Sequence, residues 1–119
     1  MGGNASSRPS FRPSFEPTLD SILSLLDRPQ RERTRLFWAE GCRSFFSALE
    51  NRWTVRAVVV SPKLLKSGEA WDRLRTIRAP VLRATPDEFA HFTRRAEPDG
   101  IGVVCEQRHG PLRGMHLDK

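Results

Sequence analysis

The hydrophobic and polar positions of this chain change their spacing several times, and each change predicts a new structural element. Leucine and isoleucine recur at helical spacing through residues 18–26, where Thr18 can cap the helix and Pro29 ends it. Four later apolar runs have the length of buried strands and lie at residues 36–39, 54–60, 81–84 and 101–105. The sequence therefore predicts one leading helix and four strands.

Three further helices are predicted between these strands. Residues 42–51 carry phenylalanine and leucine at helical spacing, and Ser67 can cap the next helix. The last helix begins at Thr85, with Pro86 at the first helical position and Glu88 at capping-box spacing. Alternating strands and helices are typical of parallel sheets covered on both faces. We therefore expect an α/β fold, a three-layer α/β/α sandwich with a mainly parallel four-stranded sheet.

The polar ends of the chain set the expected domain boundaries. Residues 1–17 are rich in Gly, Ser, Pro and Arg, and such a segment buries too little apolar surface to offset the entropy of ordering. Residues 107–119 are polar and contain glycine, as a linker or tail does. We expect a disordered leader, one domain at residues 18–106, and a linker or tail after it.

Composition limits the classes of protein that the chain can belong to. Its 119 residues suit one ordinary domain, and 38% hydrophobic with 29% charged residues is typical of a globular protein. No apolar run approaches the roughly 18 residues of a membrane span, and the N-terminus lacks a secretory signal. We therefore expect no membrane contact, a cytosolic location and reduced cysteines.

The charge favours a polyanionic partner. The net charge is +6, from 20 Lys and Arg against 14 Asp and Glu, and most of the cations are arginines. The planar guanidinium suits phosphate, so nucleic acid is a plausible partner. A solvated basic surface accounts for the same charge and stays open as an alternative.

Candidate catalytic groups are few. The three histidines, His91, His109 and His116, have no metal-ligand spacing, and no nucleophile elbow, P-loop or dinucleotide motif occurs. Cys42 begins a predicted helix beside Arg43, a setting that lowers a thiol pKa. A small cysteine enzyme is therefore one alternative, but no histidine lies near Cys42 in sequence, and a partly buried structural cysteine is the favoured interpretation. We predict no catalytic residue and no metal site.

A candidate binding site lies where the first strand ends and a helix begins. In open α/β sheets ligands bind at this edge, Gly41 permits close backbone approach, and Arg43 adds a charged fork for phosphate. Glu40 is expected to organise the turn, by capping or by an ion pair with Arg33 or Arg35. These two arginines reach the site only if the preceding segment folds back. Further along, Lys63 and Lys66 give a second basic patch, and Gly100 a turn before the last strand.

The same residues resemble a known family, the SpoU/TrmH RNA 2'-O-ribose methyltransferases, in its N-terminal substrate-binding domain. The first motif, "RxxxFWAEGCRSFFSAL", spans residues 33–49 and matches the family at Arg33, Phe37, Glu40, Gly41, Arg43, Ala48 and Leu49. The second, "PDGIGVV", matches at Pro98, Gly100, Ile101, Val103 and Val104. Asp99 replaces the usual glutamine, and Trp38-Ala39 is an atypical pair within the first strand.

The resemblance implies a fold like that of kink-turn-binding ribosomal proteins and a role in holding structured RNA. It also implies a separate knotted catalytic domain that binds S-adenosylmethionine and forms homodimers. Too few residues follow Glu106 for a domain of roughly 150 residues. We therefore expect no cofactor in this chain and no methyl transfer from these residues alone.

The expected function is RNA binding, with ribosomal or transfer RNA docked for methylation by that other domain. The residues expected to contact RNA are Arg33, Arg35, Gly41, Arg43, Lys63 and Lys66. The alternative from another class is a stand-alone protein-interaction or dimerisation domain that has lost RNA binding.

Overall fold

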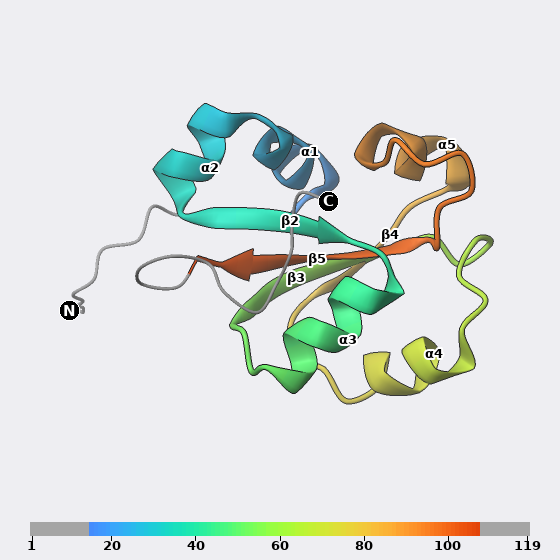
Figure 1. Ribbon diagram of the computed structural model, residues 1–119. Helices are drawn as coiled ribbons and strands as arrows, with labels where there is room; N and C mark the ends of the chain where they lie inside the picture. The colour runs from blue at the N-terminus through green and yellow to red at the C-terminus, as the bar shows by residue number, and fades with distance from the viewer. Residues whose placement is uncertain (1–14, 108–119) are drawn as a thin grey trace.

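A four-stranded sheet lies between two layers of helices in the computed structural model, which describes residues 15–107 (Figure 1). The strands are β2 (Leu36–Glu40), β3 (Val55–Val60), β4 (Val81–Arg83) and β5 (Ile101–Glu106). The helices are α1 (Leu19–Leu23), α2 (Arg28–Thr34), α3 (Cys42–Glu50), α4 (Gly68–Leu74) and α5 (Pro86–Phe89), with 3-10 turns η1 (Ser24–Leu26) and η2 (Ala90–Phe92).

The sheet is mixed, and the prediction of a mainly parallel sheet is wrong. The strand order is β2-β5-β3-β4; β5 runs antiparallel to both β2 and β3, and only β3 and β4 pair in parallel. After β4 the chain stays at the edge where β2 and β3 end, through α5, η2 and the loop that ends at Gly100. The last strand therefore enters from the edge where β2 and β3 end.

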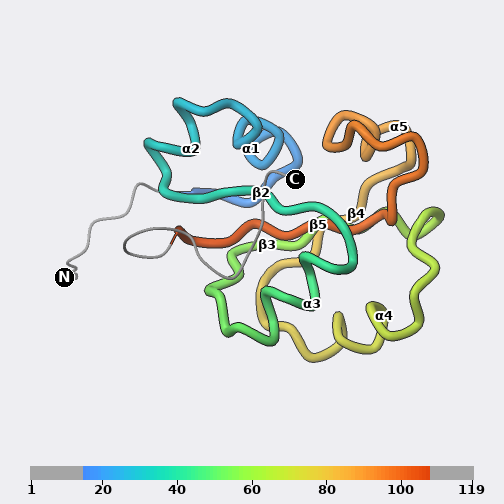
Figure 2. Tube along the Cα trace, viewed as in Figure 1, coloured from blue at the N-terminus to red at the C-terminus, as the bar shows by residue number. Residues whose placement is uncertain are grey.

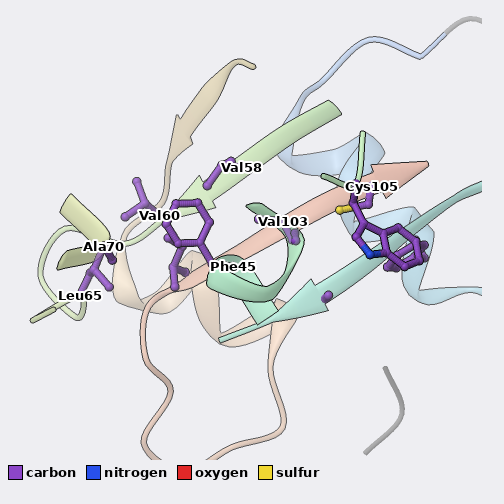
Figure 3. Packing of buried hydrophobic residues seen from close by; sticks show 12 residues of the cluster. Phe45, Val58, Val60, Leu65, Ala70, Val103 and Cys105 are labelled. Carbon is purple, nitrogen blue, oxygen red and sulfur yellow. The ribbon is translucent and has the colours of Figure 1, made fainter. Parts of the chain in front are cut away.

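The predicted three layers are present. Helices α3 and α4 cover one face of the sheet, while α1, α2 and α5 cover the other, as the tube view also shows (Figure 2). Alternate strand residues supply the two cores. Phe45 packs with Val58 and Val103 under α3 (Figure 3). On the opposite face, Phe89 packs with Val59 and Val104.

The helix starts follow the predicted capping signals. Thr18 accepts a hydrogen bond from the Ser21 amide, and Ser67 accepts one from the Ala70 amide. Thr85 forms the predicted reciprocal capping box with Glu88. These three cap predictions are confirmed.

Helix α2 was not predicted. Pro29 was interpreted as a helix stop, but it lies in the first turn of α2, where proline costs no hydrogen bond. The basic segment that precedes the first strand, residues 31–34, is therefore helical. It ends at Arg35, whose left-handed backbone (φ 61°, ψ 28°) turns the chain into β2.

The unusual tryptophan of the first strand is explained by a glycine on its neighbour. A Cβ atom added at Gly102 would lie 2.2 Å from the Trp38 ring, so the indole occupies the space that a side chain would need. Trp38 also packs against Phe89 and Phe92, with ring centroids 6.4 and 5.1 Å apart. The pair of Trp38 and Gly102 thus joins β2, β5 and the α5 layer.

Several sequence-based expectations concern the chain ends. The predicted leader and tail, residues 1–17 and 107–119, lie almost wholly outside the described residues, as do His109 and His116. Within residues 15–107, no helix is both long enough and apolar enough to cross a membrane. The same part of the chain contains no group of three His, Cys, Asp or Glu side chains that could hold a metal ion.

Candidate nucleic-acid interface

The candidate site lies at the edge where β2, β3 and β4 end and β5 begins, which we call the strand-end edge. Strands β2 and β3 both oppose β5, and β4 runs with β3, so their final residues meet at one side of the sheet (Figure 1). The turn at residues 40–42 and the loops at 61–67, 84–86 and 93–100 form this edge. It is the edge that the sequence predicted for ligand binding.

Gly41 shapes the first of these turns. Its backbone (φ 103°, ψ 160°) lies in a region that essentially only glycine adopts. Its amide donates to the Ile101 carbonyl at 2.8 Å, and an added Cβ would lie 3.1 Å from Arg95 and 3.3 Å from Asp99. Gly41 is thus buried under two side chains of the same domain. It is therefore not part of the proposed interface, which consists of exposed cations.

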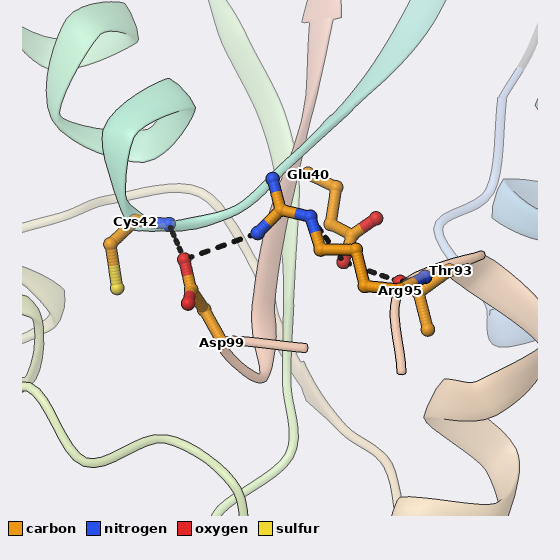
Figure 4. Close-up of polar contacts among 5 residues, drawn as sticks. All are labelled: Glu40, Cys42, Thr93, Arg95 and Asp99. Carbon is orange, nitrogen blue, oxygen red and sulfur yellow. Dashed lines mark hydrogen bonds and ion pairs between the residues drawn. The ribbon is translucent and has the colours of Figure 1, made fainter. Parts of the chain in front are cut away.

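A polar network fixes the loop at residues 93–99 against this turn (Figure 4). Asp99 Oδ2 accepts a hydrogen bond from the Cys42 amide at 2.9 Å, and therefore caps α3 from a distant loop. Arg95 bridges two acids, with Nη1 at 3.5 Å from Asp99 Oδ2 and Nε at 3.8 Å from Glu40 Oε2. Thr93 Oγ1 donates to Glu40 Oε2 at 2.6 Å.

The partners of Glu40 differ from those predicted. The expected ion pair with Arg33 or Arg35 is wrong, because those arginines precede β2 while Glu40 ends it. Glu40 instead holds Thr93 and Arg95, two residues that the sequence analysis did not single out. No local signal identifies them, since the contact joins segments more than 50 residues apart.

Gly100 makes the corresponding turn into β5. Its φ of 90° favours glycine, and an added Cβ would lie 2.7 Å from the Leu64 Cβ and 2.8 Å from the Leu65 nitrogen. Its carbonyl accepts the Ser61 amide at 2.8 Å. The loop that carries Lys63 and Lys66 is therefore held directly against the start of β5.

Cys42 does not have the electrostatic setting of a nucleophile. Burial raises the pKa of its thiol, and the nearby Asp99 carboxylate raises it further, so the expectation of a lowered pKa is wrong. A thiolate, which the chemistry needs, is thus disfavoured. The cysteine-enzyme alternative loses its physical basis.

The exposed groups of the strand-end edge are mostly cations. Arg43, Lys63 and Lys66 are all exposed here, so three of the predicted RNA-contacting residues share one edge. Arg83, which the sequence analysis did not select, ends β4 and is exposed beside them. A cavity of about 310 Å³ is lined by both Lys63 and Arg83, together with Pro62, Ala84, Thr85, Pro86 and Glu88.

The other two predicted residues lie elsewhere. Arg33 is in the last turn of α2, and Arg35 directly precedes β2, at the opposite edge of the sheet (Figure 1). The β2 strand of five residues separates Arg35 from Gly41, a distance of roughly 15 Å or more. The structure therefore does not bring them to the turn at Gly41.

Sequence comparison now places this arrangement in a family. A family model described as the MRM3-like substrate binding domain matches residues 16–102, which is most of the chain. The chain belongs to the MRM3-like substrate binding domain family. The match covers both turns described above, at Gly41 and at Gly100. Among curated proteins, none matches the chain in sequence.

Solved structures similar to this MRM3-like domain are RNA methyltransferases. The SpoU methyltransferase AviRb from Streptomyces viridochromogenes, in complex with the cofactor AdoMet, is 27% identical with a TM-score of 0.68, and the match covers 79% of this chain and 36% of that one. An rRNA methyltransferase from Sinorhizobium meliloti is 28% identical with a TM-score of 0.62, over 85% of this chain and 38% of that one.

An RNA 2'-O ribose methyltransferase shares the fold at 20% identity, with a TM-score of 0.67, over 82% of this chain and 37% of that one. The MRM3-like domain thus spans little more than a third of each solved relative. The expected resemblance to the SpoU/TrmH family is confirmed. The expected likeness to kink-turn-binding ribosomal proteins receives no support from these matches, all of which are methyltransferases.

Proposed function

We propose that this MRM3-like domain binds structured RNA at its strand-end edge and presents it to a separate methyltransferase domain. The observation that carries the proposal is the gathering of exposed Arg43, Lys63, Lys66 and Arg83 at one edge of the sheet. These cations come from three separate segments, the start of α3, the loop after β3 and the end of β4, so the fold brings them together. Membership of a substrate-binding family supports the same function.

The chemistry of this edge suits a phosphate backbone. Arg43 offers a planar fork that can bind phosphate bidentately, while Lys63 and Lys66 act as point charges. A-form RNA hides its base edges in a deep groove, so recognition of helical RNA rests on shape, phosphates and 2'-hydroxyls. The Glu40, Arg95 and Asp99 network keeps the turn beneath these cations fixed, which limits the entropy lost on binding.

Catalysis is assigned to a domain outside the described residues. AviRb is a SpoU methyltransferase with AdoMet bound, so we propose that S-adenosylmethionine serves the partner domain of this family member as well. We propose ribosomal or transfer RNA as the substrate. Homodimerisation, where it occurs, would use the catalytic domain. This domain would then contribute substrate affinity and orientation rather than chemistry.

The salt dependence of RNA affinity tests the proposal. Wild-type protein and Arg43→Ala/Lys63→Ala are titrated with labelled ribosomal RNA fragments at several salt concentrations. We expect the logarithm of affinity to fall linearly with the logarithm of salt, and the double variant to reduce that slope by about two. Arg28→Ala/Arg73→Ala is the matched control, because it removes equal charge from arginines already paired with Glu32 and Glu69.

Two outcomes would contradict the proposal. One is a wild-type affinity that does not depend on salt, and the other is a double variant that binds RNA as tightly as wild type. Size-exclusion chromatography with and without RNA distinguishes RNA binding from the alternative function, a protein-interaction or dimerisation domain. A mass that depends on protein concentration but not on RNA would assign the domain to protein interaction.

A further inference from the structure

A second group of arginines lies at the opposite side of the sheet, where β2, β3 and β4 begin. We call it the strand-start edge and define it by five exposed residues: Arg33, Arg35, Arg52, Arg75 and Arg78. They come from segments that precede three strands running in the same direction, so these segments lie at one edge of the sheet (Figure 1). The sequence analysis did not single out Arg52, Arg75 or Arg78.

Hydrogen bonds fix the position of these segments relative to one another. The Gln107 amide donates to the Arg35 carbonyl at 2.9 Å, and the Glu106 amide donates to the Thr54 carbonyl at 3.0 Å. The end of β5 therefore lies between the start of β2 and the segment that carries Arg52. With strands about 4.8 Å apart, the row from Arg35 to the start of β4 spans roughly 15 Å.

The charges of this edge are left uncompensated. Within residues 15–107, none of the five arginines forms an ion pair. Nearby acids are already engaged: Glu32 pairs with Arg28, and Glu106 pairs with Arg56 at 3.1 Å. Glu50 and Asp72 are the exposed acids that remain close in sequence. The edge therefore carries a clear excess of positive charge.

Backbone strain gives a second, independent observation. Arg35 (φ 61°) and Arg52 (φ 58°) are the non-glycine residues with positive φ in the described part of the chain. Glycine or asparagine occupies such positions at lower cost, because a Cβ atom clashes in the left-handed region. Both positions follow the end of a helix, where glycine is the usual residue, and both hold an arginine on this edge.

We infer that the strand-start edge is a second RNA-binding surface, which contacts the phosphate backbone of the same RNA that binds the strand-end edge. This inference rests on the proposed RNA-binding function. The two edges are separated by the length of a strand, about 20 Å for the six residues of β3, so no single phosphate reaches both. The RNA must lie along the domain and follow the sheet from one edge to the other.

The variant Arg35→Gly/Arg52→Gly tests the inference. Glycine removes both side chains and relieves both strained positions, so the melting temperature should equal or exceed that of wild type. Affinity for labelled ribosomal RNA fragments should nevertheless fall about tenfold, and the salt slope should decrease by about two. The control Arg28→Ala/Arg73→Ala should change affinity less than about twofold, because those arginines are already paired.

The outcomes separate the two proposals. If wild-type protein binds RNA and the glycine variant binds equally tightly, the strand-start inference is overturned while the proposed function stands. If wild-type protein shows no salt-dependent binding, the proposed function itself fails. A protein-concentration-dependent mass that the glycine variant abolishes without RNA would also overturn the inference, since the edge would then be a protein contact.

Discussion

Asp99 caps helix α3 from a loop that lies 57 residues further along the chain, and its removal is expected to destabilise the whole domain. The substitution Asp99→Ala removes three contributions. The loss of the capping acceptor costs about 1 kcal/mol, and the loss of a negative charge beside the helix N-terminus costs about 0.5 kcal/mol. The ion pair with Arg95 adds little, because the two side chains are 41% and 50% exposed.

These contributions predict that the free energy of unfolding falls by about 2 kcal/mol in Asp99→Ala. For a domain of this size, that change lowers the melting temperature by about 10 °C. Asp99→Asn keeps an acceptor oxygen and loses only the charge, so about half of this loss is expected. Denaturant titration followed by circular dichroism measures the free energy of unfolding, and thermal melts measure the melting temperature.

Glu97→Ala is the matched control, because Glu97 lies in the same loop, is exposed and forms no ion pair in the described part of the chain. It should change the unfolding free energy by less than about 0.5 kcal/mol. Equal stabilities of Asp99→Ala and Glu97→Ala would refute the capping role. If Asp99→Asn were as unstable as Asp99→Ala, charge rather than hydrogen bonding would dominate.

Three further predictions follow from the same region. Gly41→Ala should lower the unfolding free energy by about 2 to 3 kcal/mol in denaturant titrations, because φ is 103° and Arg95 must move, whereas Gly68→Ala has open space and should be nearly neutral. Gly102→Ala should destabilise by at least about 2 kcal/mol, since the added methyl overlaps the Trp38 ring. The alkylation rate of Cys42, resolved by peptide mass spectrometry, should rise with pH only above the usual thiol range, and Asp99→Asn should shift that rise to lower pH.

Each of these predictions has a contradicting result. Equal stability of Gly41→Ala and Gly68→Ala would show that the turn tolerates a side chain. A fully stable Gly102→Ala would show that the tryptophan can repack. Because the folded-state pKa of Cys42 is raised, its contribution to stability is present below the usual thiol pKa and is lost as pH rises through the raised value. If the Cys42 thiol reacted as a thiolate at neutral pH, its pKa would be lowered rather than raised, and this prediction would be contradicted.

Local signals predicted the elements of this fold well. The caps at Thr18, Ser67 and Thr85 and the apolar runs of the four strands are encoded within a few residues. The exception among the helices is α2, because Pro29 fits both a helix stop and a first-turn position. Which of the two applies depends on where the preceding helical turn ends. Here η1 ends at Leu26, before the proline, so Pro29 lies in the first turn of a new helix.

Strand order and side-chain partners could not be predicted in the same way. The alternation of strands and helices indicates parallel neighbours, but β5 inserts between β2 and β3 and runs antiparallel to both. That insertion decides which strands are neighbours. It places Arg35 beside the end of β5, where the Gln107 amide donates to the Arg35 carbonyl. The Asp99 cap is likewise invisible to local spacing, since its partner is distant in the chain.

The central claim is that RNA binds along the two edges of the sheet, and amide chemical-shift mapping tests it most directly. Isotope-labelled protein is titrated with ribosomal RNA fragments, and the amide shifts are assigned to residues. The account predicts large shifts around Arg43 and Lys63 and around Arg35 and Arg52, with the sheet centre at Val103 little changed. Shifts confined to the middle of α3 and of α4, away from both edges, or no shifts at all, would contradict it.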